Sequence, residues 1–164
     1  MDAPAPVLQA DFLAMVAKGV SVIVGSADHS LTPSLMRGVG STVSADGRDI
    51  TVFVSRSQSH QLLQDIAASG RLAAVFSQPS THLTVQLKAR RIRLREATEA
   101  DRPALQRYLQ SMEHELSVLG YPAVFARAML VHRLDDLVAI EFQPEQAFNQ
   151  TPGHQAGQPI GGSA

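Results

Sequence analysis

The residues best able to do chemistry gather in one stretch, "TVFVSRSQSHQLLQDIAASG" at 51–70. Ser55, Arg56, Ser57, Ser59 and His60 stand between an apolar run and a helical pattern. A helix N-terminus presents unpaired N–H groups and a partial positive charge. Hydroxyl donors and a guanidinium would strengthen anion binding there. The stretch therefore predicts a site for an anion such as phosphate, while simple helix capping by Ser57 or Ser59, with Arg56 in solvent, is the open alternative.

A second basic residue, Arg37, lies in the strand-like segment "TPSLMRGVGS" at 32–41. Asp46-Gly47 is a hairpin signal between this segment and the next strand. A hairpin there would bring Arg37 near the end of "TVFVSR", where two arginines and a helix N-terminus would suit a phosphate dianion. In the alternative interpretation Arg37 lies at a barrel rim with its charged end in water.

The elements that must position these residues follow from the hydrophobic periodicity. Helices are expected from about Leu8 to Gly19, at 59–69, at about 99–118 with Thr98 as N-cap, and briefly after Pro122. Six strands are expected, at 20–26, before Asp46, at 49–55, at 71–77, at 81–97 and at 137–148. Hairpin-connected strands with interspersed helices predict a mainly β, α+β fold, a six-stranded antiparallel barrel with flanking helices.

The strand at 81–97 changes its apolar parity along its length. Its apolar residues occupy odd positions from Leu83 to Ala89 and then the even positions Ile92 and Leu94. A strand that stays paired can change parity through one extra residue. We therefore expect a β-bulge near Ala89–Arg91.

Length and composition indicate one globular domain. The chain has 164 residues, a net charge of −1 and no cysteine, which excludes disulfides and cysteine-based metal sites. The opening "MDAPAPVLQADF" lacks the basic and apolar regions of a signal peptide, and no apolar run is long enough to span a membrane. We expect a cytoplasmic protein with no membrane partner, with one domain at 1–148 and an extended or flexible tail at 149–164.

The order of these segments resembles a known family. A helix is followed by "VSVIVGS", a Pro33-x-x-x-Arg37 strand, "ITVFVS", a polar turn with "SHQLLQDI", then "RLAAVF" and "LTVQLKARRI". This order is similar to that of the pyridoxamine 5′-phosphate oxidase-like FMN-binding split barrels over about residues 12–97, and 137–148 also fits. The resemblance implies a split barrel and a homodimer with FMN at the subunit interface.

The resemblance also implies roles for individual residues. Arg37 would reach the flavin phosphate, Val54 and Ser55 would contact the flavin, and the polar turn would hold the phosphate. The implied cofactor-binding residues are Arg37, Val54, Ser55, Arg56, Ser57, Ser59, His60 and Gln86, the last near the isoalloxazine ring. Lys88 or a backbone N–H would stabilise the reduced flavin. The implied function is a flavin-dependent oxidoreductase that takes hydride from NAD(P)H or an organic donor and acts on a small molecule.

The chain departs from the family in three ways. The turn has no lysine, the chain has no tryptophan, and helices are inserted at about 98–132. These departures argue against pyridoxamine phosphate as the substrate. A non-catalytic flavin or haem binder, or a barrel whose cofactor site has been lost, are the alternatives.

Two further patterns have competing interpretations. The six histidines show no metal-ligand spacing, so no metal site is expected, but His132 and His154 are candidates for a haem axial ligand because some split-barrel relatives bind haem. The segment "KARRIRLR" at 88–95 divides its charges between two strand faces and has no interleaved aromatic residue. Single-stranded nucleic-acid sites usually supply such stacking surfaces. We therefore expect no nucleic-acid partner.

Overall fold

The structure is a computed structural model that describes residues 7–161. The strands are β1 (Ser21–Ala27), β2 (Pro33–Arg37), β3 (Gly40–Val43), β4 (Ile50–Ser55), β5 (Leu72–Ser77), β6 (Thr84–Ala89), β7 (Ile92–Glu96), β8 (Leu137–Phe142), β9 (Gln146–Asn149) and β10 (Pro159–Ile160). The helices are α1 (Ala10–Lys18), α2 (His60–Ser69), α3 (Arg102–Val118) and α4 (Ala123–Met129). Short 3-10 turns are η1 (Arg56–Gln58), η2 (Glu99–Asp101) and η3 (Leu134–Asp136).

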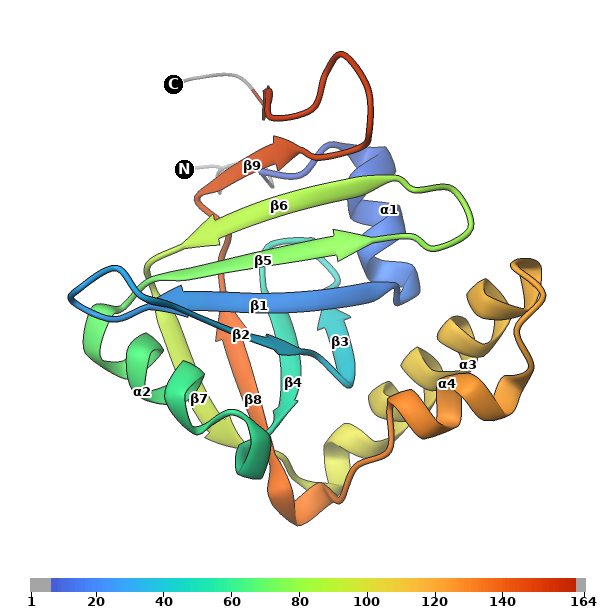
Figure 1. The fold of residues 1–164 in the computed structure, drawn as a ribbon, viewed down its shortest axis with the longest axis horizontal. Coiled ribbons are helices and arrows are strands. Elements are labelled where there is room, and N and C mark those ends of the chain that lie inside the picture. The colour runs from blue at the N-terminus through green and yellow to red at the C-terminus, as the bar shows by residue number, and fades with distance from the viewer. Residues whose placement is uncertain (1–6, 162–164) are drawn as a thin grey trace.

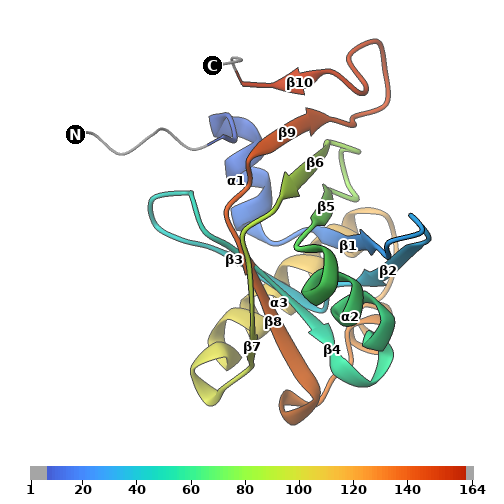
Figure 2. The same ribbon diagram turned by 90° about the vertical axis from the view of Figure 1, so that its left-hand side faces the viewer.

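These strands form two antiparallel sheets that run across each other (Figures 1 and 2). One sheet has six strands in the order β10-β9-β6-β5-β1-β2, and the other has four in the order β3-β4-β8-β7. The predicted mainly β, α+β class with antiparallel strands is confirmed. The predicted six strands become ten within residues 7–161, and in this part of the chain the two sheets are not closed into one barrel.

Three of the predicted strands are each divided between the two sheets. The bulge predicted near Ala89–Arg91 is wrong, because the chain leaves the six-stranded sheet after β6 and enters the four-stranded sheet as β7. The shift of the apolar residues from odd to even positions marks this transfer. The core lies between the two sheets, so the side of the chain that faces the core changes when the chain passes from one sheet to the other. The predicted strand at 137–148 divides likewise into β8 and β9, and the strand before Asp46 divides into β2 and β3.

Gly38 stands at the transfer from β2 to β3. Its N–H donates to the Val22 carbonyl in one sheet at 2.9 Å, while the next N–H, of Val39, donates to the Phe53 carbonyl in the other at 2.8 Å. A Cβ at Gly38 would lie 2.6 Å from Val22 Cγ1 and 2.7 Å from Val52 Cγ1. The sheets approach so closely at this point that only glycine fits.

The hydrophobic core lies between the sheets, and α2 covers one end of it (Figure 2). The predicted helix at 59–69 is confirmed, and Gly70 ends it in the left-handed conformation at φ 62°. The spacing of apolar residues in this segment predicts a buried side with Leu62, Leu63, Ile66 and Ala67. Leu62 and Ile66 are buried, Leu63 is partly buried and Ala67 is exposed. The helix also buries Asp65, which accepts a hydrogen bond from Ser34 Oγ at 2.6 Å.

The inserted helices form a hairpin, α3–α4, beside the sheets (Figure 1). The predicted cap is confirmed, because the N–H of Thr98 donates to the Asp101 carboxylate at 2.8 Å in a capping box. The Tyr108 hydroxyl ties α3 to the sheets by donating to the Val20 carbonyl at 2.8 Å. α1 ends at Gly19, as predicted, with φ 92°.

The C-terminal segment returns along the six-stranded sheet. After β9 the chain turns through residues 150–158, and β10 pairs with β9 through Pro159 and Ile160. The predicted tail at 149–164 thus contains one edge strand, and its last three positions lie outside the described residues. Among the described helices, none has the length and apolarity needed to cross a membrane.

Candidate functional site

The polar turn after β4 does bind an oxyanion, but the oxyanion belongs to the same chain. Ser57 Oγ donates to Asp136 Oδ2 at 2.7 Å, and the Ser57 N–H donates to Oδ1 at 3.0 Å. Ser55 Oγ also donates to Oδ2. Hydrogen bonds from Ser55 and Ser57 lower the pKa of Asp136 below its ordinary value. The donors therefore act together on one anionic group.

Sheet pairing explains how Asp136 reaches the turn. β4 pairs with β8, and Ser55 is opposite Leu137, so the last residue of η3 lies beside the strand end. Sequence reasoning missed Asp136 because this pairing joins segments about eighty positions apart. Two acids directly before the final strand were the only local signal.

Arg56 does not point to the same group. Its Nη2 lies 3.1 Å from Glu96 Oε1 at the end of β7, and the Arg56 side chain is 44% exposed and that of Glu96 84%. Such an exposed pair contributes little to stability and exchanges easily with solvent or ligand. Arg56 is thus part of the turn, but its guanidinium is paired with an acid and not directed at Asp136.

Ser59 is the unusual residue of the turn. It is buried, with 2% exposure, and its Oγ has no hydrogen-bond partner within the described residues. It occupies the N-cap of α2 but makes no side-chain cap bond, so the capping role predicted as the alternative is not seen there. His60, the first residue of α2, is exposed. A buried hydroxyl without a partner is uncommon and is suited to donate to a ligand.

Arg37 lies in the other sheet. The Asp46-Gly47 hairpin joins β3 to β4, whereas Arg37 ends β2, so the predicted route that brought it to the turn is wrong. Its Nη1 donates to Ser21 Oγ at 2.9 Å, and its side chain is exposed. The structure gives no direct contact between Arg37 and the turn.

Arg37 and Gln86 nevertheless share one row across the outer face of the six-stranded sheet. Arg37 is opposite Ile23, Ile23 is opposite Val75, and Val75 is opposite Gln86. At about 4.8 Å per strand the two ends of this row are about 14 Å apart. Figure 1 shows the face of β1, β5 and β6 with no helix in front of it.

The remaining predicted residues have distinct surroundings. The Val54 side chain is fully buried in the core, so only its backbone is available to a ligand. Lys88 lies on β6 with its Nζ 4.9 Å from the centre of the Phe148 ring. Two arginines of the basic segment bind acids of the same chain: Arg93 contacts Glu141, and Arg95 bridges Glu141 and Asp101.

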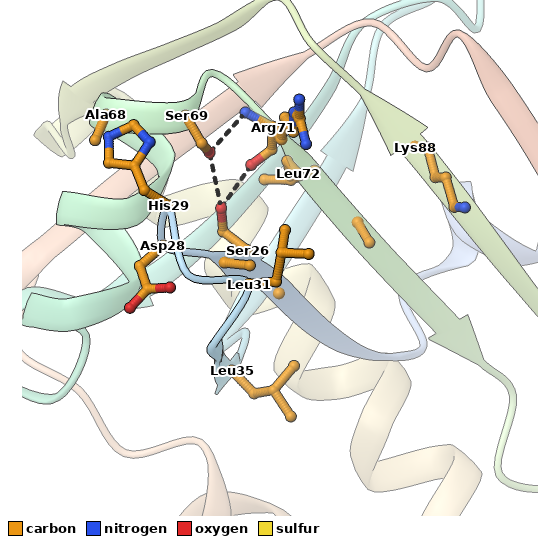
Figure 3. Close-up of a pocket in the computed structure, with 13 residues that line it drawn as sticks. Ser26, Asp28, His29, Leu31, Leu35, Ala68, Ser69, Arg71, Leu72 and Lys88 are labelled. Carbon is orange, nitrogen blue, oxygen red and sulfur yellow. Dashed lines mark hydrogen bonds between the residues drawn. The ribbon is translucent and has the colours of Figure 1, made fainter.

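A hollow lies elsewhere on the surface, at the hairpin end of β1 and β2 (Figure 3). Its volume is about 700 Å³, and it is bounded by the β1–β2 connection, the end of α2 and the start of β5. None of the eight predicted cofactor-binding residues lines it. Ser26 Oγ fixes one wall by donating to the Arg71 carbonyl at 2.8 Å.

A second depression adjoins the Asp136 turn. It has a volume of about 640 Å³, and its lining includes Glu96, Leu134 and Leu137, the neighbours of the turn along β7, η3 and β8. His132 also lines it, with Nδ1 2.9 Å from the Leu130 carbonyl. Within residues 7–161 no group of three or more histidine or acidic side chains is arranged to hold a metal ion. His154 is exposed in the loop before β10.

The fold is that of solved structures whose names include pyridoxamine 5′-phosphate oxidase-like proteins. Neither a protein-family model nor a curated protein sequence matches the chain. Solved structures do match. A protein from Clostridium acetobutylicum related to general stress protein 26, of the pyridoxinephosphate oxidase family, is similar with a TM-score of 0.50 and 13% identity, over 85% of this chain and 88% of that one.

Two other solved structures share the fold. An F420 reductase matches with a TM-score of 0.56 and 12% identity, over 85% of this chain and 98% of that one. A candidate pyridoxamine 5′-phosphate oxidase from Lactobacillus delbrueckii matches with a TM-score of 0.52 and 11% identity, over 86% of this chain and 93% of that one. Identities this low show a common fold and no more.

Proposed function

We propose that this protein is a flavin-binding homodimer of the pyridoxamine 5′-phosphate oxidase-like type, with its two sheets forming a split barrel, that holds the phosphate of FMN at residues 55–59. The observation that carries the proposal is the convergence of three donors, two hydroxyls and one N–H, on a single oxyanion at Asp136. Phosphate oxygens accept the same kind of hydrogen bond. The buried, unpartnered Ser59 hydroxyl would be a fourth donor.

Residues outside the turn would complete the cofactor site. On the outer row of the six-stranded sheet, Arg37 would add a positive charge for the phosphate and Gln86 would hydrogen-bond near the ring, and the second subunit would cover this open face. Bound FMN would supply redox chemistry, accepting hydride from NAD(P)H or an organic donor and passing electrons to a small-molecule substrate. The residues named here only bind and orient. A cytoplasmic location and the absence of nucleic-acid and membrane partners stay predictions.

The test is a titration of FMN and riboflavin into the purified protein, followed by flavin fluorescence. The proposal expects FMN to bind and riboflavin, which lacks the phosphate, to bind more weakly. Ser57→Ala should weaken FMN, and Ser69→Ala, the same change at the other end of α2, should not. Equal affinity for both flavins in every variant would contradict a phosphate site at the turn.

Haem is the second candidate, because His132 lines a depression and the Leu130 carbonyl orients its ring. A neutral imidazole whose Nδ1 is held in this way presents Nε2 as a ligand. The absorbance spectrum of protein incubated with each cofactor separates the candidates. A Soret band that shifts on binding and is lost in His132→Ala would favour haem over flavin.

A further inference from the structure

Asp136 occupies the anion position of the 55–57 turn as fully as a ligand would. Both of its carboxylate oxygens accept hydrogen bonds, one from the Ser57 N–H and the other from the Ser55 and Ser57 hydroxyls. The Ser55 and Ser57 hydroxyls also contact each other, and within residues 7–161 neither has any other hydrogen-bond partner. A phosphate at this position therefore has to compete with a carboxylate that the fold itself supplies.

The surrounding charges favour this internal arrangement. Arg133 lies near enough to lower the pKa of Asp136 further, while Arg56 is paired with Glu96. With Asp136 in place, an approaching dianion meets a like charge, while Arg56 and Arg133 are already paired with Glu96 and Asp135. Juxtaposed like charges are a strong means of excluding a ligand from a site.

We propose that Asp136 determines which ligands the turn accepts, because a phosphate binds only by displacing its carboxylate. The inference rests on the proposed phosphate site. It follows that wild type prefers FMN over riboflavin by a smaller factor than the protein without Asp136 does, and that removing Asp136 turns the same residues into a more selective phosphate site.

The experiment compares Asp136→Ala, which vacates the donors, with Asp136→Asn, which keeps the shape and one acceptor oxygen but removes the charge. Asp135→Asn is the matched control, since Asp135 is the adjacent acid, is exposed and pairs with Arg133 instead of the turn. Each full-length protein is titrated with FMN and riboflavin. Inorganic phosphate is titrated separately while the NMR shift of the Ser57 amide is followed.

Asp136→Ala should bind FMN at least about tenfold more tightly than wild type, since it removes both a competing acceptor and a like charge. Asp136→Asn should gain less, Asp135→Asn should match wild type, and riboflavin affinity should stay constant throughout. Inorganic phosphate should shift the Ser57 amide in Asp136→Ala at concentrations that leave wild type unchanged.

The two proposals fail in different ways. If FMN binds wild type and Asp136→Ala equally well, and Ser57→Ala still weakens it, the carboxylate does not compete and the role of Asp136 is refuted. If no variant binds FMN but phosphate shifts the Ser57 amide only in Asp136→Ala, the flavin proposal fails and the role of Asp136 stands. If phosphate shifts the amide in no variant, the role of Asp136 is overturned. Should Asp136→Ala not fold, Asp136→Asn decides by the same criteria.

Discussion

At the scale of single residues, three serines give the site its character. Ser55 and Ser57 bring their hydroxyls to one oxyanion, and Ser59 is buried without a partner. Hydroxyls donate without adding charge, so the turn by itself binds an anion weakly. The affinity for a dianion must come from a guanidinium. Arg37 is the candidate, because its only hydrogen bond described here goes to the neutral Ser21 hydroxyl.

We predict that Arg37→Ala weakens FMN binding by about 1.5–3 kcal/mol, the range for a hydrogen bond to a charged group. Arg37→Lys should recover only part of this, because an ammonium cannot make the paired bonds of a guanidinium. Fluorescence titration of FMN and riboflavin measures both effects. Ser21→Ala, which removes the internal partner of Arg37, is the control and should leave FMN affinity unchanged. Equal weakening of FMN and riboflavin by Arg37→Ala would assign the arginine to the ring or to the structure.

At the scale of elements, one carboxylate joins three segments. Glu115 on α3 is 1% exposed and accepts hydrogen bonds from Lys18 at 2.5 Å, Gln78 at 2.9 Å and the Ser80 N–H at 3.1 Å. These donors come from the end of α1 and from the β5–β6 connection. Burial alone would raise the pKa of Glu115, but the three hydrogen-bond partners outweigh it and lower the pKa to about 2.

Stability should therefore depend on the ionisation of Glu115. A carboxyl with a lowered folded-state pKa stabilises the fold above its unfolded pKa, near 4.5, and loses that contribution as the pH falls toward about 2. We predict that Glu115→Gln lowers the free energy of unfolding at pH 7 by about 3 kcal/mol, since it leaves the Lys18 ammonium without its acid. Glu113→Gln, two positions away on the same helix, should cost less than about 1 kcal/mol because the Arg127 side chain that pairs with Glu113 is exposed. Urea unfolding from pH 2.5 to 7 should show a flatter profile for Glu115→Gln, and parallel profiles for Glu115→Gln and wild type would contradict the assignment.

A second element-scale prediction concerns the point where the chain changes sheets. Gly38→Ala should lower the free energy of unfolding by about 1–3 kcal/mol, because the new methyl group meets Val22 and Val52, both fully buried. Gly25→Ala is the matched control. Its Cβ would lie 2.7 Å from Leu35 Cδ2, an equally short contact, but Leu35 is exposed and its end can move aside. If thermal unfolding shows that both substitutions destabilise the protein equally, the close approach of the two sheets at Gly38 does not require glycine.

The elements also show how far the sequence could be interpreted. The helices at α1, α2 and α3, the cap at Thr98 and the presence of paired antiparallel strands were predictable, because each depends on local spacing. The transfers at Gly38 and Arg90 were not: a change of parity, as at Arg90, is the same in a bulge and in a change of sheet, and the segment 32–41 was interpreted as one strand. The position of Arg37 was misjudged for that reason. Asp136 was missed because its contact with Ser57 depends on a pairing between β4 and β8 that no local pattern records.

At the scale of the whole molecule, the outer face of the six-stranded sheet is the surface whose role is still to be explained, because none of the described helices covers it (Figure 1). Ile23 and Leu35 are 39% and 67% exposed on strands β1 and β2, in rows next to each other. Arg37 and Gln86, both expected to contact the cofactor, face the same side. A second subunit laid over this face would bury the apolar side chains and enclose the ligand at once, which a single subunit cannot do.

We predict a homodimer at micromolar concentration with an interface of about 2,000 Å² in total, the range of stable dimers. Ile23→Asp, which places a charge at the centre of the proposed interface, should produce monomers in sedimentation experiments and weaken FMN binding together with dimerisation. Val131→Asp is the control, because Val131 is 77% exposed in the segment after α4 and belongs to neither sheet, so the same charge there should leave the dimer intact. The coupling of the two readouts is the decisive point. A wild-type monomer that binds FMN, or an Ile23→Asp monomer with unchanged FMN affinity, would show that one subunit forms the whole site and that the sheet face has another role.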